Sequence, residues 1–195
     1  MGIRERKERT KLKVREDILH AALTIVKTEG VQALSMRKIA DSIEYAVPII
    51  YEHFENKDAI LIELCRQGYA TMVKQIAHNH KEDASPRARL ENIVKAMWGF
   101  ATKEPELYQL MYSVGLGCNN VQQTFPELVT FRQLVWEGIG GLDAKGKKAT
   151  DQLQCRYLSF ISMLHGLVST NYFLKDIDPA TNKKVLKDFI DNMVH

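Results

Sequence analysis

Apolar residues recur along this chain at the three- and four-residue spacing of amphipathic helices. The first clear stripe consists of Ile18, Ala21, Ala22, Ile25 and Val26. Gly30 follows this stripe and suits the left-handed position after a helix C-terminus. The 195 residues include only 5 Pro and 11 Gly, and no stretch alternates apolar and polar residues as strands do. The pattern therefore predicts an all-α protein.

Pro, Gly and capping residues mark where the helices begin and end. They predict helices over about 10–30, 35–42, 46–54, 56–80, 86–103, 105–114, 122–142, 149–175 and 179–194. Breaks in the later part are marked by Gly115, Gly117, Gly140 and Gly141. The chain is long for one core, so we expect a small head over 1–55 and a larger body over 56–195.

The head contains two short helices, over 35–42 and 46–54, which are joined by Ile43, Glu44 and Tyr45. Two helices joined by a turn of this length indicate a helix-turn-helix, whose second helix can lie in the major groove of DNA. We therefore expect a three-helix DNA-binding domain at the N-terminus.

Three cations stand at helix starts, where acidic residues are ordinarily favoured. Arg37 and Lys38 open the helix over 35–42, and Lys57 opens the next long helix. Free N–H groups at a helix start, next to Arg or Lys, make an anion site that suits a phosphate group. The alternative is that all three are solvated cations, with Asp41 and Asp58 as counterions.

The positive charge is concentrated at the N-terminus. The whole chain has a formal net charge of +3, but residues 1–15 hold seven Lys or Arg against Glu5 and Glu8, a local balance of +5. Such a run is typical of a basic arm or helix extension near a polyanion. A solvated, frayed terminus is the alternative, and the neighbouring helix-turn-helix favours the arm.

The head also carries a more specific pattern. It reads Ile39-Ala40 and then Ile50-Tyr51-x-His53-Phe54-x-x-Lys57-Asp58-x-Ile60-Leu61. Over residues 15–64 the chain resembles the tetracycline-repressor (TetR) family of bacterial one-component transcription regulators, and beyond them the resemblance is architectural. Two positions depart from the family: Glu44 stands where it usually has Gly, and Ala46 replaces the usual Ser or Thr cap. A lost cap costs roughly 1 kcal/mol, which Pro48 in the first helical turn partly offsets.

The resemblance implies a DNA-binding surface on the head. Its candidate residues are Ser35, Arg37, Lys38, Tyr45, Val47, Pro48, Ile49, Tyr51, His53 and Lys57. Family positions that contact the DNA backbone are matched by Tyr51, His53 and Lys57. The positions that would face base edges are Val47, Pro48 and Ile49, and apolar side chains of this kind can pack on the methyl group of thymine. The alternative for His53 is a partly buried, hydrogen-bonded core histidine.

The body is rich in aromatic and Met residues and can enclose a drug-sized apolar ligand. Candidate ligand-binding residues are Trp98, Met111, Tyr112, Phe131, Trp136, Phe160, Met163 and His165. Such residues at helical spacing are more often plain core, which is the alternative for this set, and His165 is equally compatible with a satisfied core histidine.

The helix over 149–175 has more apolar surface than one buried face requires. With the last helix it can form a four-helix interface across a two-fold axis. Candidate interface residues are Leu153, Tyr157, Ile161, Leu164, Val168, Tyr172, Val185 and Phe189. A homodimer with heads one turn of DNA apart, roughly 34 to 36 Å, would read a palindrome.

The resemblance thus implies a ligand-responsive regulator, most simply a repressor, which leaves its operator when it binds a small apolar or amphipathic effector. The alternatives are a helical protein-interaction module with a basic arm and an unrecognised enzyme. The common catalytic motifs are absent from the sequence, so we expect no enzyme.

The cysteines and the hydropathy pattern bound the remaining possibilities. Cys65, Cys118 and Cys155 are far apart and form no C-x-x-C, and we expect no disulfide, metal site or cofactor. No apolar run is long enough to span a bilayer or to serve as a signal peptide, so we expect a soluble, cytoplasmic protein.

Overall fold

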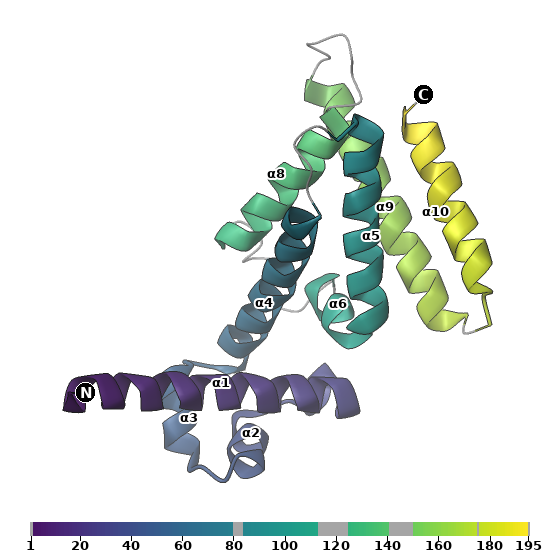
Figure 1. Ribbon diagram of the computed structural model, residues 1–195. Helices are drawn as coiled ribbons and strands as arrows, with labels where there is room; N and C mark the ends of the chain where they lie inside the picture. The colour runs from purple at the N-terminus through teal and green to yellow at the C-terminus, as the bar shows by residue number, and fades with distance from the viewer. Residues whose placement is uncertain (1, 80–83, 113–124, 141–149, 175, 195) are drawn as a thin grey trace. The chain divides into compact units, whose positions relative to one another are not determined.

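The computed structural model describes residues 2–79, 84–112, 125–140, 150–174 and 176–194. Within these ranges every regular element is a helix, which confirms the all-α prediction (Figure 1). The elements are α1 (Ile3–Glu29), η1 (Val31–Ala33), α2 (Met36–Ser42), α3 (Val47–His53), α4 (Lys57–His78), α5 (Pro86–Lys103), α6 (Pro105–Tyr112), α8 (Pro126–Gly140), α9 (Thr150–Phe173) and α10 (Pro179–Val194).

Where the structure describes them, the helix boundaries agree with the predicted ones to within about two residues, except at the start of the first helix. The predicted ends at 80, 114, 142 and 175 and the predicted starts at 122 and 149 lie outside the described residues. The first helix begins at Ile3 instead of near Thr10. The residues between them are mostly Arg, Lys and Glu, which are good helix formers, and the backbone N–H of Gly2 donates a 3.0 Å hydrogen bond to Glu5 Oε2 at the helix start. The breaks at Gly115, Gly117 and Gly141, and also Cys118, lie outside the described residues.

The described residues form two compact units. The first contains residues 2–68 and 106–112, and the second contains residues 69–79, 84–105, 125–140, 150–174 and 176–194. Helix α4 contributes its first part to one unit and its last part to the other. A DNA-binding domain bounded at residue 55 stays a prediction.

The core of the first unit begins with the apolar stripe of α1. Ile18 and Ala22 are fully buried, and α1 packs on η1 and α2 while α2 packs on α3. Ala40 and Ile50 place α2 and α3 in the same core, and neither side chain has any exposed surface. A short helix has little stability of its own, so this burial is what fixes α3 in place.

The core of the second unit is formed by helices α5, α8, α9 and α10, which pack on one another. The ring of Tyr69 lies 5.6 Å from that of Phe125 and 5.5 Å from that of Phe131. Helices α9 and α10 are further joined by Asn171 and Asn182, whose side-chain amides donate to each other's oxygens at 2.9 and 2.5 Å. In the described part of the chain, no helix combines the length and the apolar character that crossing a membrane requires.

Candidate nucleic-acid interface

The turn between α2 and α3 contains a residue in the left-handed conformation. Glu44 has φ = 59°, and the N–H of Tyr45 donates a 3.0 Å hydrogen bond back to Ala40 O. This bond closes a Schellman motif, in which the left-handed residue is usually Gly because Gly has no Cβ to clash. The conformation gives a physical reason for the Gly that the family usually has here.

The two short helices differ in how their first turns are capped. Ser35 Oγ accepts a 3.2 Å hydrogen bond from the N–H of Lys38, so the hydroxyl caps α2 as the sequence suggests. Ala46 holds the N-cap position of α3 and provides no side-chain bond, while Pro48 lies in the first turn. Helix α3 therefore begins with an uncapped N–H and relies on packing of Ile50 for its position.

The outward side of α3 presents apolar and aromatic side chains. Tyr51 is 53% exposed, and Tyr45 just before the helix is 41% exposed. Pro48 is also exposed, whereas Val47 and Ile49 are half-buried. These five candidates lie on the helix-turn-helix itself, where they are available to a partner.

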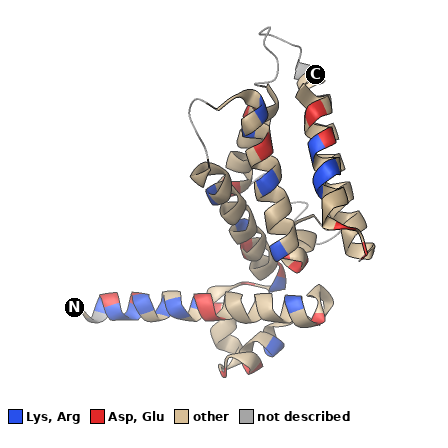
Figure 2. Ribbon diagram, turned by 45° about the vertical axis from the view of Figure 1, so that its right-hand side comes forward, with Lys and Arg blue, Asp and Glu red and all other residues tan. Residues whose placement is uncertain are grey.

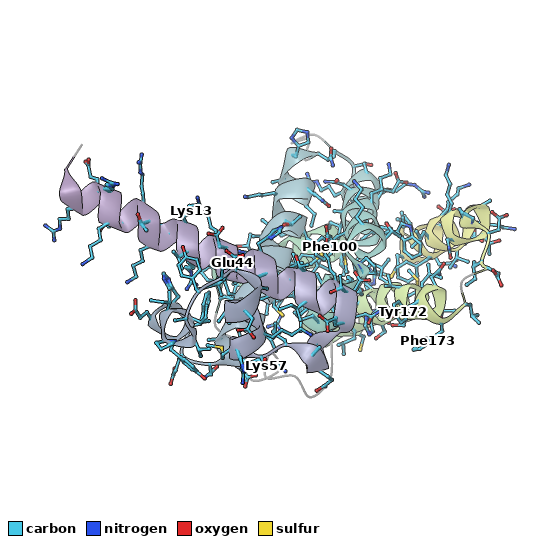
Figure 3. All side chains as sticks on the ribbon, turned by 90° about the horizontal axis from the view of Figure 1, so that it is seen from below. Lys13, Glu44, Lys57, Phe100, Tyr172 and Phe173 are labelled. Atoms are coloured by element: carbon cyan, nitrogen blue, oxygen red, sulfur yellow. The ribbon has the colours of Figure 1, made fainter. Side chains whose placement is uncertain are left out.

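The three cations at helix starts have different surroundings. Arg37 is 86% exposed, and its Nε lies 3.9 Å from a carboxylate oxygen of Asp41. Lys38 forms an ion pair with Glu29, the last residue of α1. Lys57 Nζ donates a 3.0 Å hydrogen bond to Val31 O (Figure 3 labels Lys57). Lys38 and Lys57 thus hold parts of the unit together, and Arg37 is the one of these three cations that extends most freely into solvent.

Arg15 is a structural residue of the head that sequence reasoning missed. Its Nη1 donates to His53 O at 3.2 Å, its Nη2 lies 3.1 Å from Glu63 Oε2, and its guanidinium carbon lies 4.2 Å from the centroid of the Phe54 ring. One side chain therefore joins α1 to the C-terminal end of α3 and to α4. The available signal was its position three residues before Ile18, on the buried side of α1.

His53 lies at the end of α3 and is half-buried. Burial lowers the pKa of its imidazole below the ordinary value, and the positive charges of Lys11 and Arg15 lower it further, against the opposing effect of Glu52. The imidazole is therefore held neutral near pH 7 in the free protein. Its proposed contact with the DNA backbone remains a prediction.

The basic run at the N-terminus forms the first part of α1. Figure 2 shows several Lys and Arg positions, coloured blue, along this part of the helix. All of them are exposed except Arg15, which is half-buried. The basic segment is thus helical, and the alternative of a frayed terminus does not describe it.

The candidate ligand-binding residues are divided between the two units. Met111 is buried and Tyr112 is half-buried on α6 in the first unit. In the second unit, Phe131 and Phe160 are buried, and the half-buried members are Trp98, Trp136, Met163 and His165. The ring of Trp136 stacks on that of Tyr157 at 5.4 Å, and Phe160 lies 6.0 Å from Phe189. These ring contacts favour the interpretation of Trp136 and Phe160 as core residues. His165 is half-buried, and this burial lowers the pKa of its imidazole.

A surface pocket of the second unit is lined by residues from α4, α5 and α8, by Asn79 just after α4 and by Ala84 just before α5. Its walls are Ile76, Asn79, Ala84, Ala88, Arg89, Asn92, Ile93, Leu134, Glu137 and Gly138. It contains about 430 Å³ of empty space that is partly open to solvent. None of the eight candidate ligand-binding residues lines this pocket, so a role for them in binding a ligand stays a prediction.

The candidate interface residues of α9 and α10 differ in exposure. Leu164 is buried inside the second unit, whereas Tyr172 and Val185 are exposed. The half-buried candidates are Leu153, Tyr157, Ile161, Val168 and Phe189. The end of α9 also exposes Phe173, by 79%, next to Tyr172 (Figure 3), and Leu158 is exposed earlier in the helix. Apolar side chains are thus available along α9, although Leu164 packs within the chain.

Comparison with known proteins shows which proteins this chain is similar to. Residues 18–64 match the family model for bacterial regulatory proteins of the TetR family. Over 109 residues the chain is 31% identical to the nucleoid occlusion factor SlmA of Pectobacterium carotovorum, and the match covers 54% of each protein. The chain therefore spans about half the length of the curated relatives it matches.

Two solved structures are similar to this one in fold. The transcriptional regulator FadR from Bacillus subtilis, in complex with stearoyl-CoA, has a TM-score of 0.72 at 17% identity, with 88% of this chain and 95% of that chain covered. A bacterial regulatory protein of the TetR family from Rhodococcus RHA1 has a TM-score of 0.67 at 15% identity, with 93% and 95% covered. The resemblance to the TetR family is confirmed for residues 18–64, which match the model for these bacterial regulatory proteins, and the fold of the chain agrees with it.

Proposed function

We propose that this protein is a ligand-responsive transcriptional repressor that binds a palindromic operator as a homodimer. The observation that carries the proposal is the exposed side of α3, which belongs to a helix-turn-helix inside the region that matches the family model. Ile50 anchors the helix in the core, and Pro48 and Tyr51 are left exposed. This is the arrangement by which a second helix enters a major groove.

Base recognition by this helix relies on apolar contacts. Val47, Pro48 and Ile49 have no groups for bidentate hydrogen bonds, but they can pack on thymine methyl groups. Replacing thymine by uracil in the half-sites should therefore weaken specific binding. Equal affinity for the two duplexes would exclude this mode of recognition.

Selection of bound duplexes from a random pool is the experiment that tests DNA binding and dimer geometry together. We expect a palindrome whose half-sites lie about one helical turn apart. We also expect affinity that falls steeply with salt and is much tighter for the selected duplex than for random duplex. Enrichment of no sequence would overturn the proposal and would favour an acidic protein as partner of the basic helix.

The effector in this proposal is a small apolar or amphipathic molecule. The aromatic residues of the second unit support this class, and the fold of FadR is able to hold an acyl-CoA. The effector would shift α4, which contributes residues to both units, and it must bind two states of the protein with different affinity. Stearoyl-CoA is a suitable first probe: it should weaken binding to the selected duplex, and a bound effector without any effect on that affinity would contradict this coupling.

The proposed homodimer uses α9 and α10, where Tyr172 and Val185 are exposed. Because chromosomal DNA is the proposed partner, a cytoplasmic location follows from the proposal. It assigns no catalytic step and no cofactor to the chain.

A further inference from the structure

The first part of α1 extends as a helix beyond the core of the first unit. The helix begins at Ile3, and among residues 4–29 the first buried side chain is that of Val14. At 1.5 Å per residue, residues 3–13 span about 16 Å. The basic run is therefore carried on a helical segment whose side chains have defined directions.

The cations of this segment lie on two different sides of the helix. Arg4, Lys7 and Lys11 follow one another at spacings of three and four residues, and the same spacing leads on to Arg15 and the buried Ile18. A helix turns by about 100° per residue, so Arg6, Arg9 and Lys13 lie on the far side. All six side chains are exposed, and none of them forms an ion pair within the described part of the chain.

Contacts of Arg15 show where the first of these two sides points. Arg15 binds the carbonyl oxygen of His53 at the end of α3 and stacks over the ring of Phe54. Lys11 lies one helical turn earlier on the same side, and its charge is one of those that lower the pKa of His53. The side with Arg4, Lys7 and Lys11 therefore continues outward from the end of α3.

We propose that Arg4, Lys7 and Lys11 form a one-sided arm that contacts DNA phosphates next to the half-site that α3 reads. This inference rests on the proposed function, because it extends the footprint of the same DNA complex. A helical arm of about 16 Å is as long as about five base pairs of a duplex, which rises 3.4 Å per base pair. The opposite cations, Arg6, Arg9 and Lys13, would remain in solvent.

Two triple variants separate this arm from a general effect of charge. The arm variant is Arg4→Gln, Lys7→Gln and Lys11→Gln, and the control variant is Arg6→Gln, Arg9→Gln and Lys13→Gln. Both remove three positive charges from exposed positions, and Gln is about as good a helix former as Lys or Arg. Thermal unfolding of both should match that of the parent.

The measurement is the salt dependence of binding to a duplex that the parent selects, with ten base pairs of flank on each side. A plot of log K against log salt has a negative slope, and each lost phosphate contact makes it less steep by about 0.9. The slope of the arm variant should therefore be less steep than that of the parent by up to about 2.7 per protomer. The slope of the control variant should differ from that of the parent by less than about 1. Hydroxyl-radical footprinting should show flank protection by the parent and the control but not by the arm variant.

The outcomes distinguish this inference from the proposed function. Equal losses of slope in the two variants, with unchanged flank protection, would overturn the one-sided arm and leave DNA binding standing. A parent protein that selects no duplex would instead overturn the proposed function.

Discussion

Replacing Glu44 by Gly is expected to stabilise the head. Glu44 holds a left-handed conformation with φ = 59°, fixed by the bond from the N–H of Tyr45 to Ala40 O (Glu44 is labelled in Figure 3). A side chain in this conformation costs about 1–2 kcal/mol, because its Cβ crowds the backbone. The Gly variant avoids this cost, but its free energy of unfolding falls by about 0.4–1 kcal/mol because its unfolded chain has more conformational freedom. The net gain from the middle of these two ranges is about 0.8 kcal/mol, and their limits give about 0 to 1.6 kcal/mol.

The assay is urea unfolding of the parent beside the Glu44→Gly and Glu44→Ala variants. Both variants remove a carboxylate from the C-terminal end of α2, where negative charge is unfavourable. Only the Gly variant removes the Cβ, so the difference between the two variants isolates the backbone effect. In thermal unfolding, a gain of this size raises Tm by about 1–4 °C for a chain of this length. Equal stability of the Gly and Ala variants would refute the reasoning.

Three further changes test other features. Ala46→Ser adds the missing cap of α3 and should raise the free energy of unfolding by about 1 kcal/mol; no gain would mean that the N–H groups are already satisfied. Lys11→Gln should raise the pKa of His53 in an NMR titration, whereas Lys13→Gln should leave it unchanged. Gly166→Leu places a large side chain on an exposed side of α9, where an added Cβ meets no atom within 4 Å. It should leave the fold intact and weaken dimerisation in analytical ultracentrifugation, and an unchanged dimer would place the interface elsewhere.

The pH dependence of stability follows from the lowered pKa of His53. The folded protein binds the proton less readily than the unfolded chain, whose histidine titrates near 6.5. Stability contributed by the neutral imidazole is therefore present above this value and is lost as the pH falls through the lower pKa of the folded protein. His165, which burial also shifts downward, acts in the same direction.

Helix positions were predictable because local chemistry sets them. Pro86 and Pro179 occupy first helical turns, and α5 and α10 begin at these residues as the sequence predicts. Ser35 caps α2 by a bond within four residues of chain, which is equally local. The predicted start of α1 near residue 10 was wrong because charged residues such as Arg4 continue a helix without any apolar stripe.

Contacts between distant residues were not predictable in the same way. The ammonium group of Lys57 donates a hydrogen bond to Val31 O, 26 residues away, which the sequence did not indicate; its contact with a phosphate stays a prediction. On α9, Leu158 is exposed and Leu164 is buried, although both are leucines on one apolar helix. The sequence identifies apolar positions, but packing decides which of them face the core, a ligand or another subunit.

The surroundings of the cations separate two tasks within the head. Lys38 and Lys57 make contacts within the first unit, whereas Arg37 and the cations before Val14 on α1 are exposed to solvent. Phosphate contacts supply affinity and its salt dependence, whereas base contacts supply specificity. In our proposal α3 reads bases through apolar contacts alone. Changes in the basic part of α1 should then lower affinity for every duplex alike, while the sequence preference stays with α3.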